Sequence, residues 1–333
     1  MITPRLYRRS LAAAAQWRLL LLFWMGLLVP GTIAALPVSR FLAKLLDHST
    51  VAGQHVAWMD GATLIEIARQ LGTDGNGAAI GGGLLGGLIA LAFFAPLVAG
   101  ATVAAARSDE PLPFSRLLAG GGELYFRMLR TTLWGAVPVG LGLGVASLLV
   151  GAVAKLNEKA IWEATAGRRK LVALVAASLV VFVFHLLVDL TRAQFAADPT
   201  RRSALFALWA SVRVFLRRPL RILGMGAVGT VAAFVPAAVF MLLRLRVTQS
   251  TAMAIGTAWL LAQLAQLSVG WGRNARLFGL AELVRADALD RPVAQAFTME
   301  PPASNPPAVE SALLPALSAP GSPDLSTPDR SAT

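Results

Sequence analysis

Six long apolar runs alternate with shorter polar segments along the chain, and these runs set its class. Each run holds about 20 residues or more, the length that a helix rising 1.5 Å per residue needs to cross a bilayer core of ~30 Å. The runs show no alternation of period two, so they predict helices and not the strands of a barrel. We expect an all-α, polytopic transmembrane helical bundle with spans at residues 17–37, 78–106, 131–153, 171–191, 220–243 and 252–271.

The segments between the runs arrange the six spans as three helical hairpins. Two segments on the same side of the membrane, 113–130 and 199–221, are amphipathic and end in arginine directly before a span. This pattern predicts helices that lie in the membrane interface. In the first segment, residues 120–122 are all glycine and are expected to break the helix. In the second, we expect Asp198 as the N-cap and Pro199 as the first helical residue.

The composition divides the chain into two regions. Residues 1–291 form the predicted transmembrane domain, and residues 292–333 hold 9 of the 19 prolines together with serine and alanine. Such a stretch cannot bury a core, so it predicts a disordered cytoplasmic tail. We expect the first apolar run to be retained as a span, because it is longer than the core of a cleaved signal peptide.

Overall composition agrees with a membrane protein and excludes several functional classes. The 333 residues are 56% hydrophobic and 14% charged, against about 25% charged in soluble domains, and the mean hydropathy is +0.63. Cysteine is absent, which excludes disulfides and thiol nucleophiles. The net charge is +12, and the cations that cause it flank the spans. Membrane threading therefore accounts for them, and we expect no nucleic-acid partner.

Lysine and arginine distribute unevenly between the two sides of the predicted membrane. The segments that share the side of the N-terminus carry 20 of them and the opposite side carries 10, which places both termini in the cytoplasm. The short loop 154–170 carries five cations on the outer side and opposes this orientation. We expect anionic lipid headgroups as partners of the basic inner segments. The predicted headgroup-facing residues are Arg202, Arg213, Arg217, Arg218 and Arg221.

Glycine pairs spaced by four residues mark faces on which helices can pack closely. They are Gly82 with Gly86, Gly83 with Gly87, and Gly140 with Gly144. Packing within the bundle is favoured, and contact between two copies in a homo-oligomer stays open. No strand precedes these glycines, so they predict neither a nucleotide site nor any other cofactor site.

His185, Asp189 and Arg192 form the candidate polar cluster of the chain. They lie at helical spacing near the inner end of the fourth span, so their side chains share one face. Ionisable groups at membrane depth are functional candidates, and substrate or proton handling stays open. A structural hydrogen-bonded cluster is favoured, because Asp189 lies at the membrane boundary, where such a cluster costs less. In the sixth span, Gln263 and Gln266 are expected to point inward and bond across helices.

The polar outer loop holds two histidines and three acidic residues but no recognisable metal-ligand pattern. His48 and His55 accompany Asp47, Asp60 and Glu66, but their spacing matches no established set of zinc ligands. We therefore expect no metal site, no catalytic residues and no cofactor in this chain.

Four segments together resemble a group of uncharacterised bacterial six-span membrane proteins. They are residues 189–192 (DLTR), 198–203 (DPTRRS), 217–221 (RRPLR) and 271–282 (WGRNARLFGLAE). The resemblance covers most of residues 1–290. It implies a helical bundle in the inner membrane of a bacterium and carries no known activity.

Three functions are consistent with the sequence. The favoured one is a non-enzymatic membrane protein that organises lipids or protein partners, since basic interfacial helices and a long tail suit that role. The alternative is a transporter or channel subunit, suggested by prolines inside four spans. The third is an intramembrane enzyme acting on lipid, for which only the His185 and Asp189 region and the outer-loop histidines qualify.

Overall fold

The structure is a computed structural model, and every regular element that it describes is an α-helix. The predicted all-α class is therefore confirmed for this part of the chain. Two units are distinguished, Met1–Asp290 and Arg291–Thr333, and the predicted tail lies in the second, outside the described residues. The described residues are 4–46, 65, 69–72, 75–158, 162–248 and 251–289.

Six long apolar helices correspond to the six predicted spans, and each is long and apolar enough to cross a membrane. The chain is thus a multi-pass membrane protein. The helices extend beyond the apolar runs, because backbone hydrogen bonding continues into the polar flanks where water or headgroups can solvate the side chains. They are α2 (Trp17–Leu46), α5 (Asn76–Arg107), α7 (Tyr125–Asn157), α8 (Glu163–Ala197), α10 (Pro219–Arg246) and α11 (Ala252–Leu289).

Three short helices precede or connect the spans: α1 (Pro4–Ala14), α6 (Phe114–Glu123) and α9 (Ala204–Arg217). Helices α6 and α9 fall in the predicted interfacial segments. Helix α1 was not predicted from the sequence. It is attached to α11 by a hydrogen bond from Trp271 Nε1 of α11 to the carbonyl oxygen of Leu11, at 3.0 Å.

The predicted N-cap of the second interfacial helix was wrong. Asp198 ends α8 and accepts hydrogen bonds from the hydroxyl and backbone N–H of Thr200, at 2.6 and 3.0 Å. The side-chain hydrogen bond from Thr200 lowers the pKa of Asp198. Helix α9 begins later, with Ser203 as N-cap, whose hydroxyl oxygen accepts the N–H of Phe206 at 3.4 Å.

The prediction that the glycines at 120–122 break the first interfacial helix is wrong. They are helical, and the helix ends at Glu123. A Cβ at Gly121 would lie 2.8 Å from the carbonyl oxygen of Leu97, and one at Gly120 would collide with Ala104. Glycine is therefore needed there for the close approach of α6 to α5.

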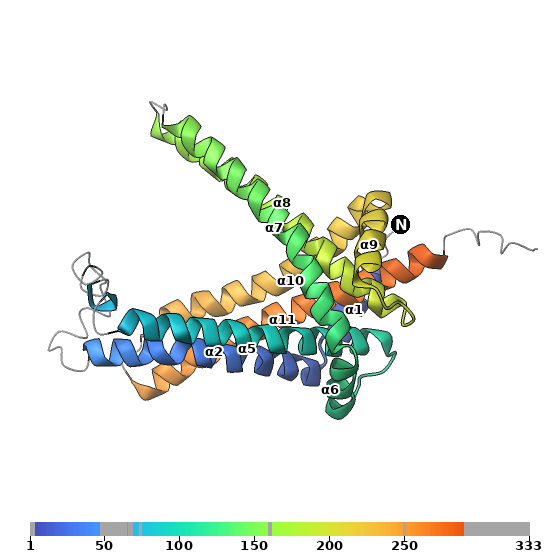
Figure 1. The fold of residues 1–333 in the computed structure, drawn as a ribbon, viewed down its shortest axis with the longest axis horizontal. Helices are drawn as coiled ribbons and strands as arrows, with labels where there is room; N and C mark the ends of the chain where they lie inside the picture. Colours follow the sequence, from blue (N-terminus) through green and yellow to red (C-terminus); the bar gives the residue numbers. More distant parts are fainter. Residues whose placement is uncertain are drawn as a thin grey trace, which may run out of the picture. The chain divides into compact units, whose positions relative to one another are not determined.

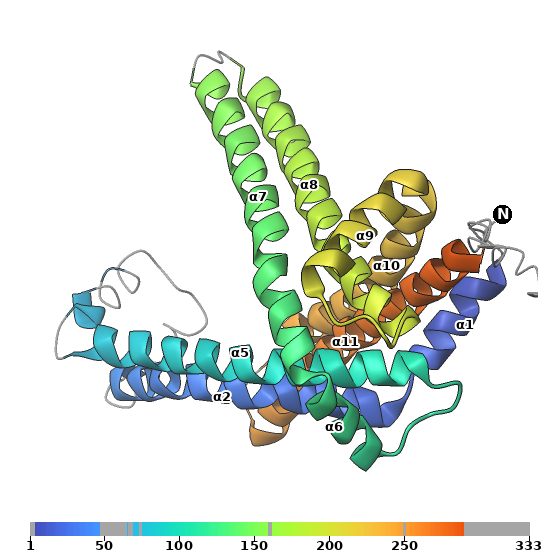
Figure 2. The same cartoon turned by 45° about the vertical axis from the view of Figure 1, so that its right-hand side comes forward.

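The long helices pair in sequence order, α2 with α5, α7 with α8, and α10 with α11, as Figures 1 and 2 show. This is the predicted arrangement of three hairpins. Helix α11 also contacts α1, α2, α5 and α8, so it connects the hairpins to one another. One cross-helix bond is the predicted one, from Trp24 Nε1 to Gln263 Oε1 at 2.7 Å, whereas Gln266 is exposed.

The apolar core gathers where these helices meet. Among its fully buried side chains are Leu19 of α2, Val103 of α5, Phe195 of α8, Met225 of α10 and Leu280 of α11. The far parts of α7 and α8 instead expose large apolar side chains, as expected for surfaces that face acyl chains.

Close contact between α10 and α11 depends on glycine and gives a first prediction. A Cβ at Gly272 would lie 2.5 Å from the backbone N of Ala233 and the carbonyl oxygen of Gly229. We expect Gly272→Val to destabilise the protein by about 1–3 kcal/mol or more, since overpacking against backbone cannot relax. Thermal unfolding in lipid nanodiscs would show a lower midpoint. Gly144→Val is the matched control, because a Cβ there meets no described atom within 4 Å, and an equal shift in both variants would contradict the prediction.

Candidate functional site

Asp189 lies in the interior of the bundle, where α8 faces α11. Its side chain is 3% exposed and pairs with two guanidinium groups. Arg192, one turn further along α8, places Nη1 3.1 Å from Oδ1, and Arg276 of α11 places Nη2 2.5 Å from Oδ2. The carboxylate therefore joins two helices that are far apart in sequence. The spacing of Asp189 and Arg192 indicated one pair, but only the packing of α11 on α8 shows the second.

Arg276 extends the cluster to a third helix. Its Nη1 donates to Thr230 Oγ1 of α10 at 3.2 Å, while Nη2 pairs with Asp189 of α8. The side chain crosses this interface beside Gly229, where an added Cβ would lie 2.6 Å from the Cβ of Arg276. Two glycines, Gly229 and Gly272, thus bring α10 close enough to α11 for the three helices to share one polar centre.

His185 lies one turn before Asp189 and belongs to the same face. Its Nε2 is 3.8 Å from Asp189 Oδ2, and its side chain is 46% exposed. This separation exceeds the length of a hydrogen bond, so the imidazole does not orient the carboxylate directly. His185, Asp189 and Arg192 lie together, as predicted. The carboxylate pairs with arginine, and the imidazole lies at the edge of the cluster. In this geometry the charge partners of Asp189 are the two arginines, which supports a structural ion pair.

Two other arginines donate hydrogen bonds to carbonyl oxygens at the C-terminal ends of helices. Arg107 donates through Nε and Nη2 to the carbonyl oxygen of Phe195, at 3.1 and 2.8 Å. Arg285 donates to the carbonyl oxygens of Ala106 and Ala196, at 2.6 and 3.3 Å. These carbonyls belong to the last turns of α5 and α8, which lack intrahelical partners. The two cations therefore satisfy helix C-termini and complement their dipoles.

The predicted headgroup-facing arginines divide into two groups. Arg202, Arg213 and Arg217 are exposed, as a headgroup contact requires. Arg218 and Arg221 are partly buried, and Arg218 pairs with the buried Asp287 of α11 at 3.1 Å. An internal carboxylate thus engages one predicted surface cation, and this pairing is not visible in the local sequence.

The predicted helix-packing glycines also differ in their surroundings. A Cβ at Gly83, Gly86 or Gly87 would press on α2, so these three lie in the interface between α2 and α5. Gly82, Gly140 and Gly144 have no described atom within 4 Å of such a Cβ. Instead α7 approaches α8 at Gly135 and Gly142, which face Val188 and Phe184.

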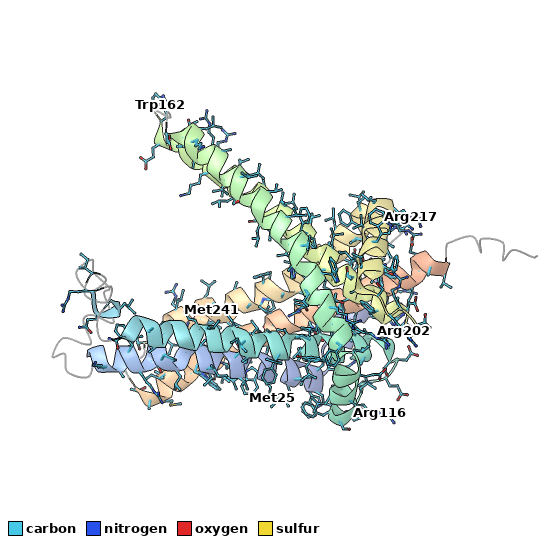
Figure 3. All side chains as sticks on the ribbon, viewed as in Figure 1. Met25, Arg116, Trp162, Arg202, Arg217 and Met241 are labelled. Atoms are coloured by element: carbon cyan, nitrogen blue, oxygen red, sulfur yellow. The ribbon has the colours of Figure 1, made fainter. Side chains whose placement is uncertain are left out.

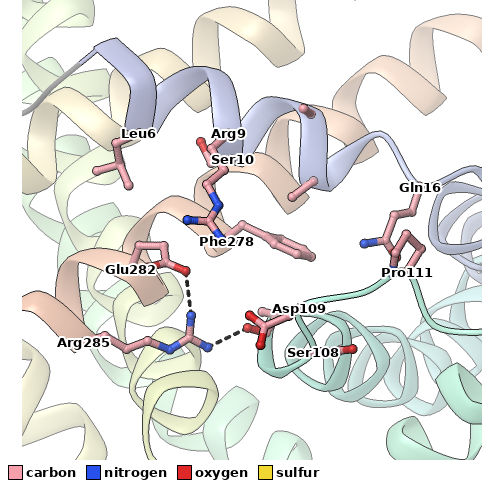
Figure 4. Close-up of a pocket in the computed structure, with 13 residues that line it drawn as sticks. Leu6, Arg9, Ser10, Gln16, Ser108, Asp109, Pro111, Phe278, Glu282 and Arg285 are labelled. Carbon is pink, nitrogen blue, oxygen red and sulfur yellow. Dashed lines mark hydrogen bonds and ion pairs between the residues drawn. The ribbon is translucent and has the colours of Figure 1, made fainter.

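A cavity of about 160 Å³ lies between α1, α11 and the segment that follows α5 (Figure 4). Arg9 and Arg285 face it together with Asp109 and Glu282, and Glu282 accepts a hydrogen bond from Arg285 at 2.8 Å. Charges of both signs are balanced in this wall, so the cavity shows no preference for an anion or a cation.

Within the described part of the chain, no group of three or more His, Cys, Asp or Glu side chains could hold a metal ion. The loop residues Asp47, His48, His55, Asp60 and Glu66 lie outside it. No family model, no curated protein and no solved structure matches this chain.

The Asp189 cluster gives a second prediction. We expect Asp189→Asn to lower the free energy of unfolding by about 3–5 kcal/mol, because the change leaves two buried guanidinium groups without a counter-charge. The midpoint temperature of thermal unfolding and the yield of protein in the membrane should both fall. His185→Gln is the control, and its effect should stay below about 1 kcal/mol because that side chain is half exposed. An Asp189→Asn protein as stable as the wild type would instead indicate a functional carboxylate.

Proposed function

We propose that this chain is a non-enzymatic protein of a bacterial inner membrane, with both termini in the cytoplasm, that binds anionic lipid headgroups. Binding would occur along a collar of exposed arginines on the short helices and their flanks, and would serve to organise lipids in the surrounding leaflet. The collar consists of Arg5, Arg8 and Arg9 on α1, Arg116 on α6, and Arg202, Arg213 and Arg217 at α9.

The observation that carries this proposal is the gathering of the short basic helices at one end of the long helices. Figures 1 and 2 show α1, α6 and α9 near this end, and Figure 3 labels Arg116, Arg202 and Arg217 there. Trp162 is labelled at the opposite end of the α7–α8 pair. A basic residue near an anionic leaflet contributes about 1 kcal/mol to binding, so several together favour stable engagement of anionic lipid.

Two tryptophans support an interfacial position for this end. Trp209 of α9 and Trp17 at the start of α2 are 57% and 67% exposed. The guanidinium groups of Arg213 and Arg18 lie 5.4 Å from the ring centroids of Trp209 and Trp17, respectively. Indole rings are stable at headgroup depth, and a cation beside each ring can contact lipid phosphate at the same depth.

The two carboxylates buried in α8 and α11 argue against cation transport. Asp189 is held by Arg192 and Arg276, and Asp287 by Arg218. A proton or sodium relay needs a carboxylate that can exchange its charge partner, and a buried pair with arginine resists that exchange. Lipid binding through exposed arginines requires no such group.

The test compares two variants that lose the same charge. In the collar variant, Arg116, Arg202, Arg213 and Arg217 are all replaced by Gln. In the control variant, Lys155, Arg168, Arg169 and Arg246, which are exposed at the other ends of α7, α8 and α10, are replaced by Gln. Both proteins are extracted from membranes that contain phosphatidylglycerol and phosphatidylethanolamine.

We expect native mass spectrometry to show several-fold less phosphatidylglycerol retained by the collar variant than by the control, with unchanged phosphatidylethanolamine. Retention by the wild type should fall as salt rises, because exposed charges are screened. Equal loss in both variants, or no loss in either, would refute a specific role for the collar.

A further inference from the structure

A small cavity between α2, α5, α8 and α11 lies directly beside the Asp189 cluster. Its polar wall is formed by Asp189, Arg192, Arg273 and Asn274, and Phe23 and Val98 belong to its apolar wall. We propose that this cavity is a binding site for one small monatomic anion of the halide class, such as chloride. The proposal does not depend on lipid binding by the collar, which involves other residues.

Charge is the first argument. Arg192, Arg273 and Arg276 all lie within electrostatic reach of Asp189, which is the one carboxylate among the residues that line the cavity. Guanidinium groups stay protonated in proteins, so this centre cannot lose its excess positive charge by titration. Neutral or protonated His185 adds no negative charge. Uncompensated charge is costly in a buried site, and a bound anion removes that cost.

Unused hydrogen-bond donors are the second argument. Asn274 is 2% exposed and Arg192 is 9% exposed. Asn274 Nδ2 and Arg192 Nε find no acceptor among the described residues. Buried donors without acceptors are rare in folded proteins and indicate a missing partner. Both side chains belong to the cavity wall, so one acceptor in the cavity could receive both. Thr102 does not compete, since its hydroxyl donates to the carbonyl of Val98 at 2.8 Å.

Size decides the class of anion. The cavity offers about 20 Å³, and roughly 10–15 Å³ is needed for one water molecule. A halide ion fits such a space, whereas sulfate, phosphate and a lipid headgroup are too large. A water molecule would fit and accept the two donors, but it would leave the excess positive charge in place.

The experiment measures thermal unfolding of the full chain in nanodiscs of uncharged lipid. The buffer contains gluconate, and chloride, bromide, sulfate or phosphate is added at constant ionic strength. We expect the midpoint to rise saturably with chloride and bromide and to stay unchanged with sulfate and phosphate, because only ligands that bind the native state stabilise it. An equal rise with every anion would indicate surface screening and overturn the site.

Variants and diffraction locate the effect. Arg273→Gln should weaken the apparent chloride affinity at least tenfold, and Asn274→Leu should weaken it in the same direction. Arg202→Gln, which changes an exposed collar residue, should leave it unchanged. Crystals of the wild type grown in bromide should give an anomalous peak beside Arg192 and Asn274. A chloride effect that survives Arg273→Gln, or bromide peaks only elsewhere, would refute the assignment.

Discussion

The ion pairs of Asp189 are the interaction on which the rest of the structure depends. One buried carboxylate binds Arg192 of its own helix and Arg276 of α11, and Arg276 continues to Thr230 of α10. Helix α11 in turn contacts all three hairpins. In a bilayer, burial of apolar surface gives little preference for one helix contact over another, since lipid tails are as apolar as leucine. Polar contacts and close packing at glycine must therefore determine which helices meet.

Much of the fold could be predicted because its strongest signal is local. The length of an apolar run reports a span directly, and the six spans and three hairpins follow from it. The choice of contacts could not be predicted in this way. The spacing of Gly140 and Gly144 equals that of Gly83 and Gly87, yet only the second pair lies against a neighbouring helix. A pattern shows which residues share a face of one helix, but not which helix that face meets.

The same limit applies to the arginines. Their number on one side of the spans predicts an orientation, but the count treats every arginine as equivalent. In the structure, Arg107 and Arg285 satisfy carbonyls at helix ends, and Arg218 pairs with Asp287. Arg202 and Arg217 stay exposed. Partners of the inward-facing group come from distant helices, so local sequence separates them poorly from surface cations.

A chain that gathers arginine at one end of its helices must compensate that charge, and it does so in three ways. Helix C-termini neutralise part of the field of Arg107 and Arg285 through oriented carbonyl dipoles. Carboxylates neutralise Arg218 and part of the Asp189 centre. The collar arginines are exposed, so solvent and salt screen their charge. At the Asp189 centre, Arg192, Arg273 and Arg276 share the single carboxylate of Asp189, so that carboxylate cannot neutralise all three cations. The proposed small anion in the adjacent cavity would neutralise the remaining positive charge of this centre, as carbonyls and carboxylates do for the other arginines.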